Sequence, residues 1–166
     1  MSAASLMTAL VVHDVIVVDG CDGTGKTTLA RALRDRHGYR LVHSARTPDG
    51  TNLTGRYRQL LATPGKIALD RSFVSELVYG PLFHGRSRLS PQETADLAER
   101  AAERGGILVH LTGDPDVIAD RLRARDGHVP PVELIRGIID GFHSVFGLLE
   151  RSAPVRTIDT TSGPPA

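Results

Sequence analysis

Residues 20–27 read GCDGTGKT and place three glycines next to a lysine and a threonine. This order fits the pattern G-x-x-x-x-G-K-[ST], in which glycines let the backbone curl so that successive N–H groups point at phosphate oxygens. The lysine of the pattern reaches the β- and γ-phosphates, and the hydroxyl residue holds Mg²⁺. We therefore expect Lys26 to act on nucleotide phosphates and Thr27 to be a metal ligand.

The whole loop is predicted to bind a nucleotide. The residues expected around the phosphates are Gly20, Asp22, Gly23, Thr24, Gly25, Lys26, Thr27 and Thr28. Cys21 is the single cysteine of the chain, so no internal disulfide is expected, and we interpret it as a tolerated loop residue, not a redox switch.

The loop needs a strand before it and a helix after it, and the sequence supplies both. Residues 15–19 form an apolar, β-branched run, and residues 27–37 have helical spacing that stops at Gly38. Further strands are predicted at 39–44, 66–70, 107–112 and 155–159, and further helices at 57–61, 72–83, 90–104, 114–125 and 131–150. The alternation predicts the α/β class: a three-layer fold with a five-stranded parallel sheet covered by helices on both faces, and ligands at the carboxyl ends of the strands.

Length and charge limit the number of domains and the kinds of partner that we expect. With 166 residues, 40% of them apolar, we expect one domain over residues 14–160, an N-terminal extension over 1–13 and a tail over 161–166. The net charge of +1 gives no overall basic field, so a polyanion could bind only locally. Residues 1–12 are apolar but lack a basic start and are too short to span a bilayer, so we expect no membrane association and a cytoplasmic location.

Two acidic residues, each at or just after the end of a predicted strand, are candidates for a metal ligand. Asp70 follows the strand at 66–70 and precedes Arg71, where its carboxylate can hold Mg²⁺ directly or through water. Asp114 precedes a proline at a helix start and fits a helix N-cap better. We therefore predict Thr27 and Asp70 as the metal residues.

Several segments together resemble the thymidylate kinase family. The stretch GCDGTGKTT at 20–28 looks like its phosphate loop, with Asp19 and Asp22 at the two acidic places. RTPDGT at 46–51, GRYRQLL at 55–61 and DRSFVSELVYG at 70–80 are similar to later segments of that family, and the Asp-Arg-Ser form also resembles deoxynucleoside kinases. RLRARDG at 121–127 lies where the arginine-bearing lid is found. The resemblance covers nearly the whole chain and implies a P-loop kinase that uses ATP and Mg²⁺.

Two departures from this family fall on the acceptor side. Thymidylate kinases carry a long helix between the second and third strands, and here RQLLATPGKIALD runs almost directly from one to the other. Gly80 stands where glutamine is usual after the tyrosine. Phosphoryl transfer is therefore supported better than thymidylate as the substrate.

The resemblance and the charges together assign roles on the donor side. Phosphoryl transfer needs positive groups around the migrating unit, and Lys26 with the loop amides supplies them for the donor. Arg121 and Arg125 lie four residues apart on one helical face and could close over the phosphates. A solvated basic face is the alternative for this segment; it suits Arg123 as well as a lid role does, and it suits Arg121 and Arg125 less well. Asp19 could accept the proton of an acceptor hydroxyl or could brace the loop, and both roles stay open.

On the acceptor side we expect Arg46 and Arg71 at the acceptor or transferring phosphate, with Ser75 and Tyr79 beside the acceptor. The expected reaction moves the γ-phosphate of ATP to a nucleoside or nucleoside monophosphate. A hydroxyl of a larger acceptor, such as a modified base in DNA, is the alternative, and nucleic acid is expected only in that capacity. A third hypothesis is that the protein is a regulator, which binds a nucleotide without catalysing a reaction. A homodimer is left open by the sequence.

Overall fold

The computed structural model of the chain describes residues 3–44 and 47–162. Its five strands form one sheet in the order β2-β3-β1-β4-β5, and all neighbouring strands are parallel. The strands are β1 (Val15–Gly20), β2 (Arg40–His43), β3 (Ile67–Asp70), β4 (Ile107–Thr112) and β5 (Val155–Asp159). The five-stranded parallel sheet predicted from the sequence is therefore confirmed.

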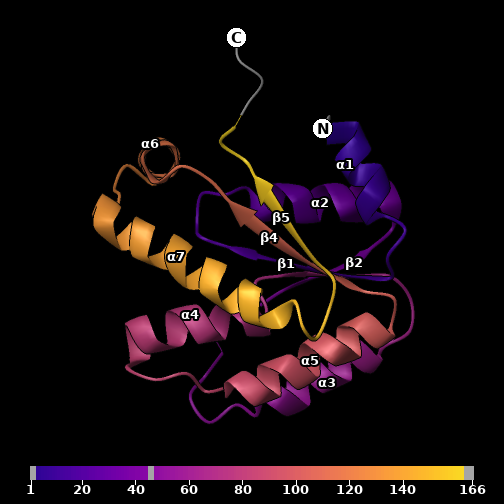
Figure 1. Cartoon of the computed structure of the whole chain (residues 1–166). Coiled ribbons are helices and arrows are strands. Elements are labelled where there is room, and N and C mark those ends of the chain that lie inside the picture. The colour runs from indigo at the N-terminus through magenta and orange to yellow at the C-terminus, as the bar shows by residue number, and fades with distance from the viewer. Residues whose placement is uncertain (1–2, 45–46, 163–166) are drawn as a thin grey trace.

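Helices cover both faces of this sheet (Figure 1). They are α1 (Ala3–Leu10), α2 (Lys26–His37), α3 (Leu53–Ala62), α4 (Phe73–His84), α5 (Pro91–Glu103), α6 (Pro115–Asp126) and α7 (Val132–Leu149). Alternation along β1 separates the two layers: Val15 and Val17 pack toward α3, α4, α5 and α7, while Ile16 and Val18 pack toward α1 and α2. The predicted three-layer α/β architecture is confirmed.

Local sequence signals set several helix boundaries. Ser90 and Glu93 form the capping box that their spacing predicts, so α5 starts directly after Ser90. Asp114 accepts hydrogen bonds from the backbone N–H groups of Asp116 and Val117 and caps α6, which accounts for this carboxylate as an N-cap. Gly38 ends α2 with φ at +71°.

The ends of the chain are more ordered than the sequence suggests. Residues 3–10 form α1 instead of a loose extension, because Leu10 is fully buried and packs against the sheet together with Leu33 of α2. At the other end, Thr161 and Ser162 donate hydrogen bonds to Asp159, whereas residues 163–166 of the predicted tail lie outside the described part. None of the helices in residues 3–44 and 47–162 combines the length and apolar character that a membrane span requires.

The strands direct their carboxyl ends toward one edge, where α6 crosses (Figure 1). The loop after β1, the end of β3 and the start of α4 meet at this edge, since β1 pairs with β3 on one side and with β4 on the other. Ligands of open parallel sheets bind in this position. The fold thus brings the predicted phosphate loop and the predicted acceptor segment together.

Candidate active site

The loop after β1 adopts a conformation that requires glycine. Gly20 has φ of +150°, and a Cβ there would lie 2.1 Å from the carbonyl oxygen of Leu111 in β4, so no larger residue fits. Gly23 has φ of +84° and faces Ile118 and Leu122 of α6. The glycines therefore let the loop lie between β4 and the helix that carries the lid arginines.

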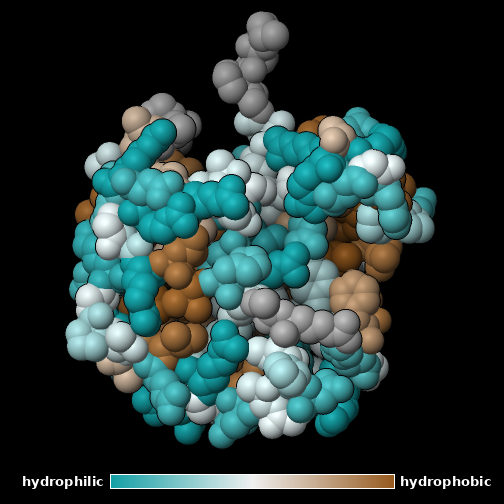
Figure 2. All heavy atoms as spheres, turned by 180° about the vertical axis from the view of Figure 1, so that it is seen from behind, coloured by the Kyte–Doolittle hydropathy of each residue, from teal (hydrophilic) through white to brown (hydrophobic). Residues whose placement is uncertain are grey.

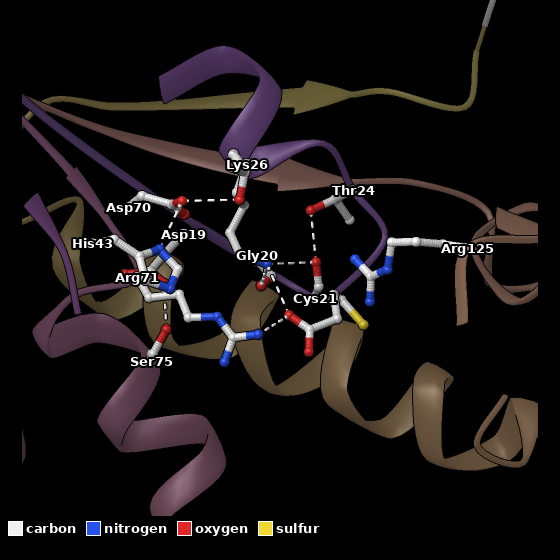
Figure 3. Close-up of polar contacts among 12 residues, drawn as sticks. Asp19, Gly20, Cys21, Thr24, Lys26, His43, Asp70, Arg71, Ser75 and Arg125 are labelled. Carbon is white, nitrogen blue, oxygen red and sulfur yellow. Dashed lines mark hydrogen bonds and ion pairs between the residues drawn. The ribbon is translucent and has the colours of Figure 1, made fainter. Parts of the chain in front are cut away.

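Lys26 lies inside this loop and is almost fully buried. Its Nζ donates hydrogen bonds to the carbonyl oxygens of Gly20 and Cys21, both at 2.9 Å, and to Asp22 Oδ1 at 3.3 Å (Figure 3). Thr24 folds back and donates to the carbonyl of Cys21 at 2.7 Å. The charge of the lysine is thus held at the loop, in the position where a phosphate can compete for it.

The loop cysteine is an inert part of this structure. Cys21 is 2% exposed, and burial raises the pKa of its thiol to about 11. The thiolate is the reactive form of cysteine, so this environment disfavours redox chemistry. The interpretation of Cys21 as a loop residue agrees with its surroundings.

A cavity of about 580 Å³ lies over the loop. Five basic side chains line it against one carboxylate, that of Asp22, and the basic residues are Lys26, Arg31, Arg71, Arg121 and Arg125. Such an excess of positive charge favours a polyphosphate. We name this space the phosphate cavity.

Most of the residues predicted to bind the nucleotide line the phosphate cavity: Asp22, Gly23, Gly25, Lys26, Thr27 and Thr28. Gly20 and Thr24 lie beneath it and shape the loop instead, through the packing and the hydrogen bond given above. Arg31 and His43 also line the cavity and were missed in the sequence. Arg31 follows Thr27 by four residues on the same helix, and His43 ends a strand, so both positions carried a detectable signal.

The two predicted lid arginines both line the phosphate cavity from α6. Arg121 is anchored to the chain after β5, donating to the carbonyl oxygen of Thr160 at 2.6 Å and to its hydroxyl at 3.1 Å. Arg125 pairs with Asp126. Arg123 pairs with the exposed Asp120 and is absent from the cavity lining, as expected for a solvated position.

The residues predicted to hold the metal contact each other. Thr27 donates its hydroxyl hydrogen to Asp70 Oδ2 at 3.0 Å, which leaves a lone pair of the Thr27 oxygen for a cation. Asp70 is buried, and its Oδ1 has no hydrogen-bond partner within the described residues. A hydroxyl and an unpartnered carboxylate oxygen are the hard oxygen ligands that Mg²⁺ prefers, so these two residues fit the ion.

Arg71 lies at the boundary between the phosphate cavity and a second cavity, since both include it. Its φ of +59° is the one positive value among the non-glycine residues described, which is a conformation typical of functional sites. Its Nη2 donates to Asp22 Oδ1 at 2.5 Å, and its guanidinium lies 5.9 Å from the ring centre of Tyr79. The Asp22 carboxylate and the Tyr79 ring therefore together fix the orientation of the Arg71 guanidinium.

The Asp22 carboxylate accepts hydrogen bonds from both Lys26 and Arg71. Burial acts to raise the pKa of its carboxyl, but the charges and hydrogen bonds of Lys26 and Arg71 outweigh this effect and hold the pKa below its ordinary value. Asp22 lines both cavities. One carboxylate therefore links the donor side to the neighbouring cavity.

The second cavity has a volume of about 560 Å³ and is lined by residues of α3, α4, α6 and α7. Leucine, isoleucine and aromatic side chains make much of its lining. Its polar residues are Asp22, Ser44, Thr47, Arg71, Ser72, Ser75, Glu76, His84 and Arg88. On the face seen from behind, hydrophobic atoms lie between hydrophilic side chains (Figure 2). We name this space the acceptor cavity.

The acceptor cavity contains three of the four predicted acceptor residues. Arg71, Ser75 and Tyr79 line it, whereas Arg46 lies outside the described residues. Burial raises the pKa of the Tyr79 hydroxyl, and its ring stacks on Phe83 at a centroid distance of 5.6 Å. Phe83 was missed in the sequence because an exposed phenylalanine at a helix end gives no signal of its own.

Gly80, the departure from the family pattern, has a packing cause. A Cβ at this position would lie 2.9 Å from the Arg86 carbonyl oxygen and 2.9 Å from the Ser87 Cα. The chain after α4 folds back here, and Arg88 pairs with Glu76 at 2.9 Å and donates to the Thr47 carbonyl at 3.2 Å. The acceptor cavity is thus closed by a segment that leaves no room for glutamine.

Asp19 is fully buried beneath both cavities and appears in the lining of neither. Its Oδ2 accepts from the backbone N–H of Ser72 at 3.0 Å and from the Ser72 hydroxyl at 2.5 Å, and its Oδ1 accepts from the Ser75 hydroxyl. Burial raises the pKa of this carboxyl, and the serine hydrogen bonds act against the rise. These contacts favour the bracing role, because they fix the start of α4 to the end of β1.

Comparisons with known proteins agree with this geometry at the level of the fold. No protein-family model and no curated protein matches the sequence. Among solved structures, the YorR protein from Bacillus subtilis in complex with phosphorylated GDP is 24% identical, with a TM-score of 0.77 over 88% of this chain and 85% of that chain.

Two further structures are named kinases. A deoxyadenosine kinase from M. mycoides with bound dCTP is 13% identical, with a TM-score of 0.57 over 88% of this chain and 90% of that chain. A gluconokinase from Sinorhizobium meliloti 1021 is 20% identical, with a TM-score of 0.54 over 90% of this chain and 83% of that chain. These likenesses establish that the chain has the P-loop nucleotide/nucleoside kinase-like fold.

Proposed function

We propose that this protein is an ATP-dependent kinase that transfers the γ-phosphate to a nucleoside or a nucleoside monophosphate. The observation that carries the proposal is the pair of adjoining cavities, one basic and one mainly apolar, that share Arg71 and Asp22. Direct transfer needs two bound reactants with their reacting atoms held in line. Adjoining cavities with an arginine between them suit that requirement.

The donor side uses the loop and α6. Lys26 exchanges its bonds to the loop carbonyls for the β- and γ-phosphates, while the loop N–H groups and the amino end of α2 receive the remaining charge. Thr27 and Asp70 hold Mg²⁺, which neutralises charge on the donor phosphates when bound. Arg121 and Arg125 approach from the opposite wall of the cavity.

Transfer takes place beside Arg71. Its planar guanidinium exchanges Asp22, which it contacts through Nη2, for the oxygens of the migrating phosphoryl group or of an acceptor phosphate, and either group can accept a bidentate contact. The proton of an acceptor hydroxyl then needs a base, and Asp22, which lines both cavities, becomes available once Arg71 turns to phosphate. Binding of the donor phosphates by Arg71 therefore frees Asp22 to act as the base for the acceptor hydroxyl.

The acceptor cavity has the size and the lining of a small-molecule site. A volume of about 560 Å³ lies within the ordinary range for such sites, and a largely apolar surface with polar groups placed along it is their usual character. Tyr79 and Phe83 offer aromatic faces to a base. The nucleotides named in two of the matching structures add support for a nucleotide or nucleoside at this fold.

Acceptor-dependent ADP release tests the proposal. ATP and Mg²⁺ are supplied with single nucleosides, nucleoside monophosphates, small sugars or oligonucleotides, and Lys26→Ala serves as the inactive control. We expect ADP release to rise with a nucleoside or a nucleoside monophosphate and to stay at background in the control. A response to oligonucleotides alone would instead favour a hydroxyl of a larger acceptor. ATP binding without any acceptor response would favour a nucleotide-binding regulator.

A further inference from the structure

His43, which the transfer chemistry above leaves unused, lies beside the metal residue Asp70. β2 pairs with β3 in parallel, and the register places His43 opposite Asp70, each as the last residue of its strand. Parallel strands end at the same edge of the sheet, so both side chains reach the carboxyl edge. His43 lines the phosphate cavity, and its Nδ1 lies 2.9 Å from Asp70 Oδ2 (Figure 3).

The two oxygens of the Asp70 carboxylate differ in their hydrogen-bond partners. Oδ2 lies within hydrogen-bond distance of both the His43 ring and the Thr27 hydroxyl, at 2.9 and 3.0 Å. Oδ1 is buried and has no hydrogen-bond partner within the described residues. A carboxylate oxygen offers about two acceptor positions, so two donors saturate Oδ2 and leave Oδ1 for a cation or for water bound to one.

The ring nitrogen has a defined part in this arrangement. A carboxylate oxygen only accepts hydrogen bonds, so the ring carries a hydrogen on Nδ1 and donates it to Oδ2. The His43 side chain is about half exposed, whereas the Asp70 side chain is 1% exposed. What the partly solvated ring provides to the buried carboxylate is therefore a directional hydrogen bond.

We propose that His43 is a positioning residue of the metal site, and that its hydrogen bond holds the Asp70 carboxylate beside Thr27 in the orientation in which it would act on Mg²⁺. The inference rests on the proposed function, because that function supplies the metal and the donor phosphates. Groups that hydrogen-bond a metal ligand without touching the metal change metal affinity by about 10- to 100-fold when removed. His43 then determines how tightly the site holds its ion.

Metal binding measured directly tests this role. Mn²⁺ replaces Mg²⁺, and its binding to the protein with a non-hydrolysable ATP analogue is followed by electron paramagnetic resonance. His43→Ala is expected to weaken Mn²⁺ binding about 10- to 100-fold. His43→Asn is expected to recover most of the affinity, because its amide N–H can take the place of the Nδ1 donor.

A matched control removes an imidazole elsewhere. His13 precedes β1 at the opposite end of the strand, and its Nδ1 contacts the Gly105 carbonyl at 3.0 Å, so His13→Ala should leave Mn²⁺ binding unchanged. Affinity for the ATP analogue in EDTA is measured for all four proteins, so that any effect on nucleotide binding is separated from the effect on Mn²⁺ binding. Thermal melting checks that the variants are folded, and the Asn variant keeps the test valid if the Ala variant is not.

The outcomes separate this inference from the proposed function. Mn²⁺ binding of His43→Ala equal to wild type, in a protein that still transfers phosphate, overturns the role of His43 alone. An Asn variant as weak as the Ala variant also overturns it, since the hydrogen bond would then not be the cause. Wild-type protein that neither holds Mn²⁺ with the analogue nor transfers phosphate contradicts both proposals together.

Discussion

Asp19→Ala and Asp19→Asn separate the two roles that the sequence leaves open for this carboxylate. Asp19 accepts three hydrogen bonds, two from Ser72 and one from Ser75, in a fully buried position. Alanine removes all three and leaves the N–H of Ser72 without this acceptor. If Asp19 braces the loop, alanine lowers stability and the asparagine variant, which has the same shape, does not.

The magnitude follows from the contacts. Hydrogen bonds to a charged group contribute about 1.5–3 kcal/mol each, so three contribute roughly 4–9 kcal/mol. Burying the carboxylate costs several kcal/mol, which alanine recovers, so the net loss for Asp19→Ala is about 2–4 kcal/mol. For a chain of this length, 1 kcal/mol shifts Tm by roughly 2–4 °C, which gives a fall of about 5–15 °C.

Asparagine keeps the network. Its amide oxygen can accept from Ser72, and its NH₂ can donate to the Ser75 hydroxyl, which both donates and accepts. We expect Asp19→Asn to melt within a few degrees of wild type and to keep turnover within about tenfold, whereas loss of a general base costs about 10²–10⁴-fold. Calorimetry and acceptor-dependent ADP release measure the two quantities, and Asp35→Ala, at an exposed site of α2, is the control.

Two results contradict the bracing role of Asp19. An Asp19→Ala protein that melts like the Asp35→Ala control would show that the three hydrogen bonds add little. An Asp19→Asn protein that is fully stable but has lost a thousandfold or more in turnover, within the range for a missing base, would identify Asp19 as the base itself.

Four further predictions concern the charges of the site and one buried histidine. Lys26→Ala should lower turnover about a hundredfold or more, because charge on the phosphates is then uncompensated; unchanged steady-state turnover contradicts the assignment. EDTA should abolish activity and Mg²⁺ restore it, and Asp70→Asn should need more Mg²⁺ for the same rate; activity in chelator opposes this. Arg71→Lys should lose most activity at saturating ATP, because lysine lacks the bidentate fork; full activity means that the acceptor site is misplaced. Burial lowers the pKa of His110 to about 4. As the pH falls from about 6.5 to about 4, the unfolded state binds the His110 proton before the folded state does, so the free energy of unfolding should drop by on the order of 3 kcal/mol. Chemical unfolding of His110→Phe should lack this drop, and an equal drop in both proteins would show that His110 is not its cause.

The sequence predicts the sheet well because its strands carry local signals. β4 and β5 have the predicted bounds, since β4 is a short apolar run before the capped helix α6 and β5 is a short stretch with three β-branched residues, Val155, Thr157 and Ile158. α1 was missed because its support is tertiary: Leu10 is buried against the sheet, and nothing within residues 1–13 reveals that contact. α3 starts at Leu53, earlier than predicted, because Asn52 caps it and its interior Gly55 hid the helical pattern.

The donor side of the site is also readable, and the acceptor side much less so. The phosphate loop is contiguous in sequence, so one pattern specifies it together with its helix. The acceptor cavity takes its walls from four helices, and Leu134 and Ile138 of α7 reach it only through the packing of α7 on α4. Side chains that meet from distant segments leave no spacing in the sequence to detect.

A bisubstrate inhibitor tests the central claim, that the two cavities hold the donor and the acceptor of one direct transfer. The compound joins adenosine through a chain of phosphates to the best acceptor of the panel, and its Kd is measured by calorimetry beside those of ATP and of the acceptor alone. Linking two modules that bind adjoining sites raises affinity by about 10²–10⁴-fold. We predict a gain in this range that largely disappears in Arg71→Ala, since Arg71 lies where the cavities meet. A linked compound that binds no more tightly than ATP would contradict the claim.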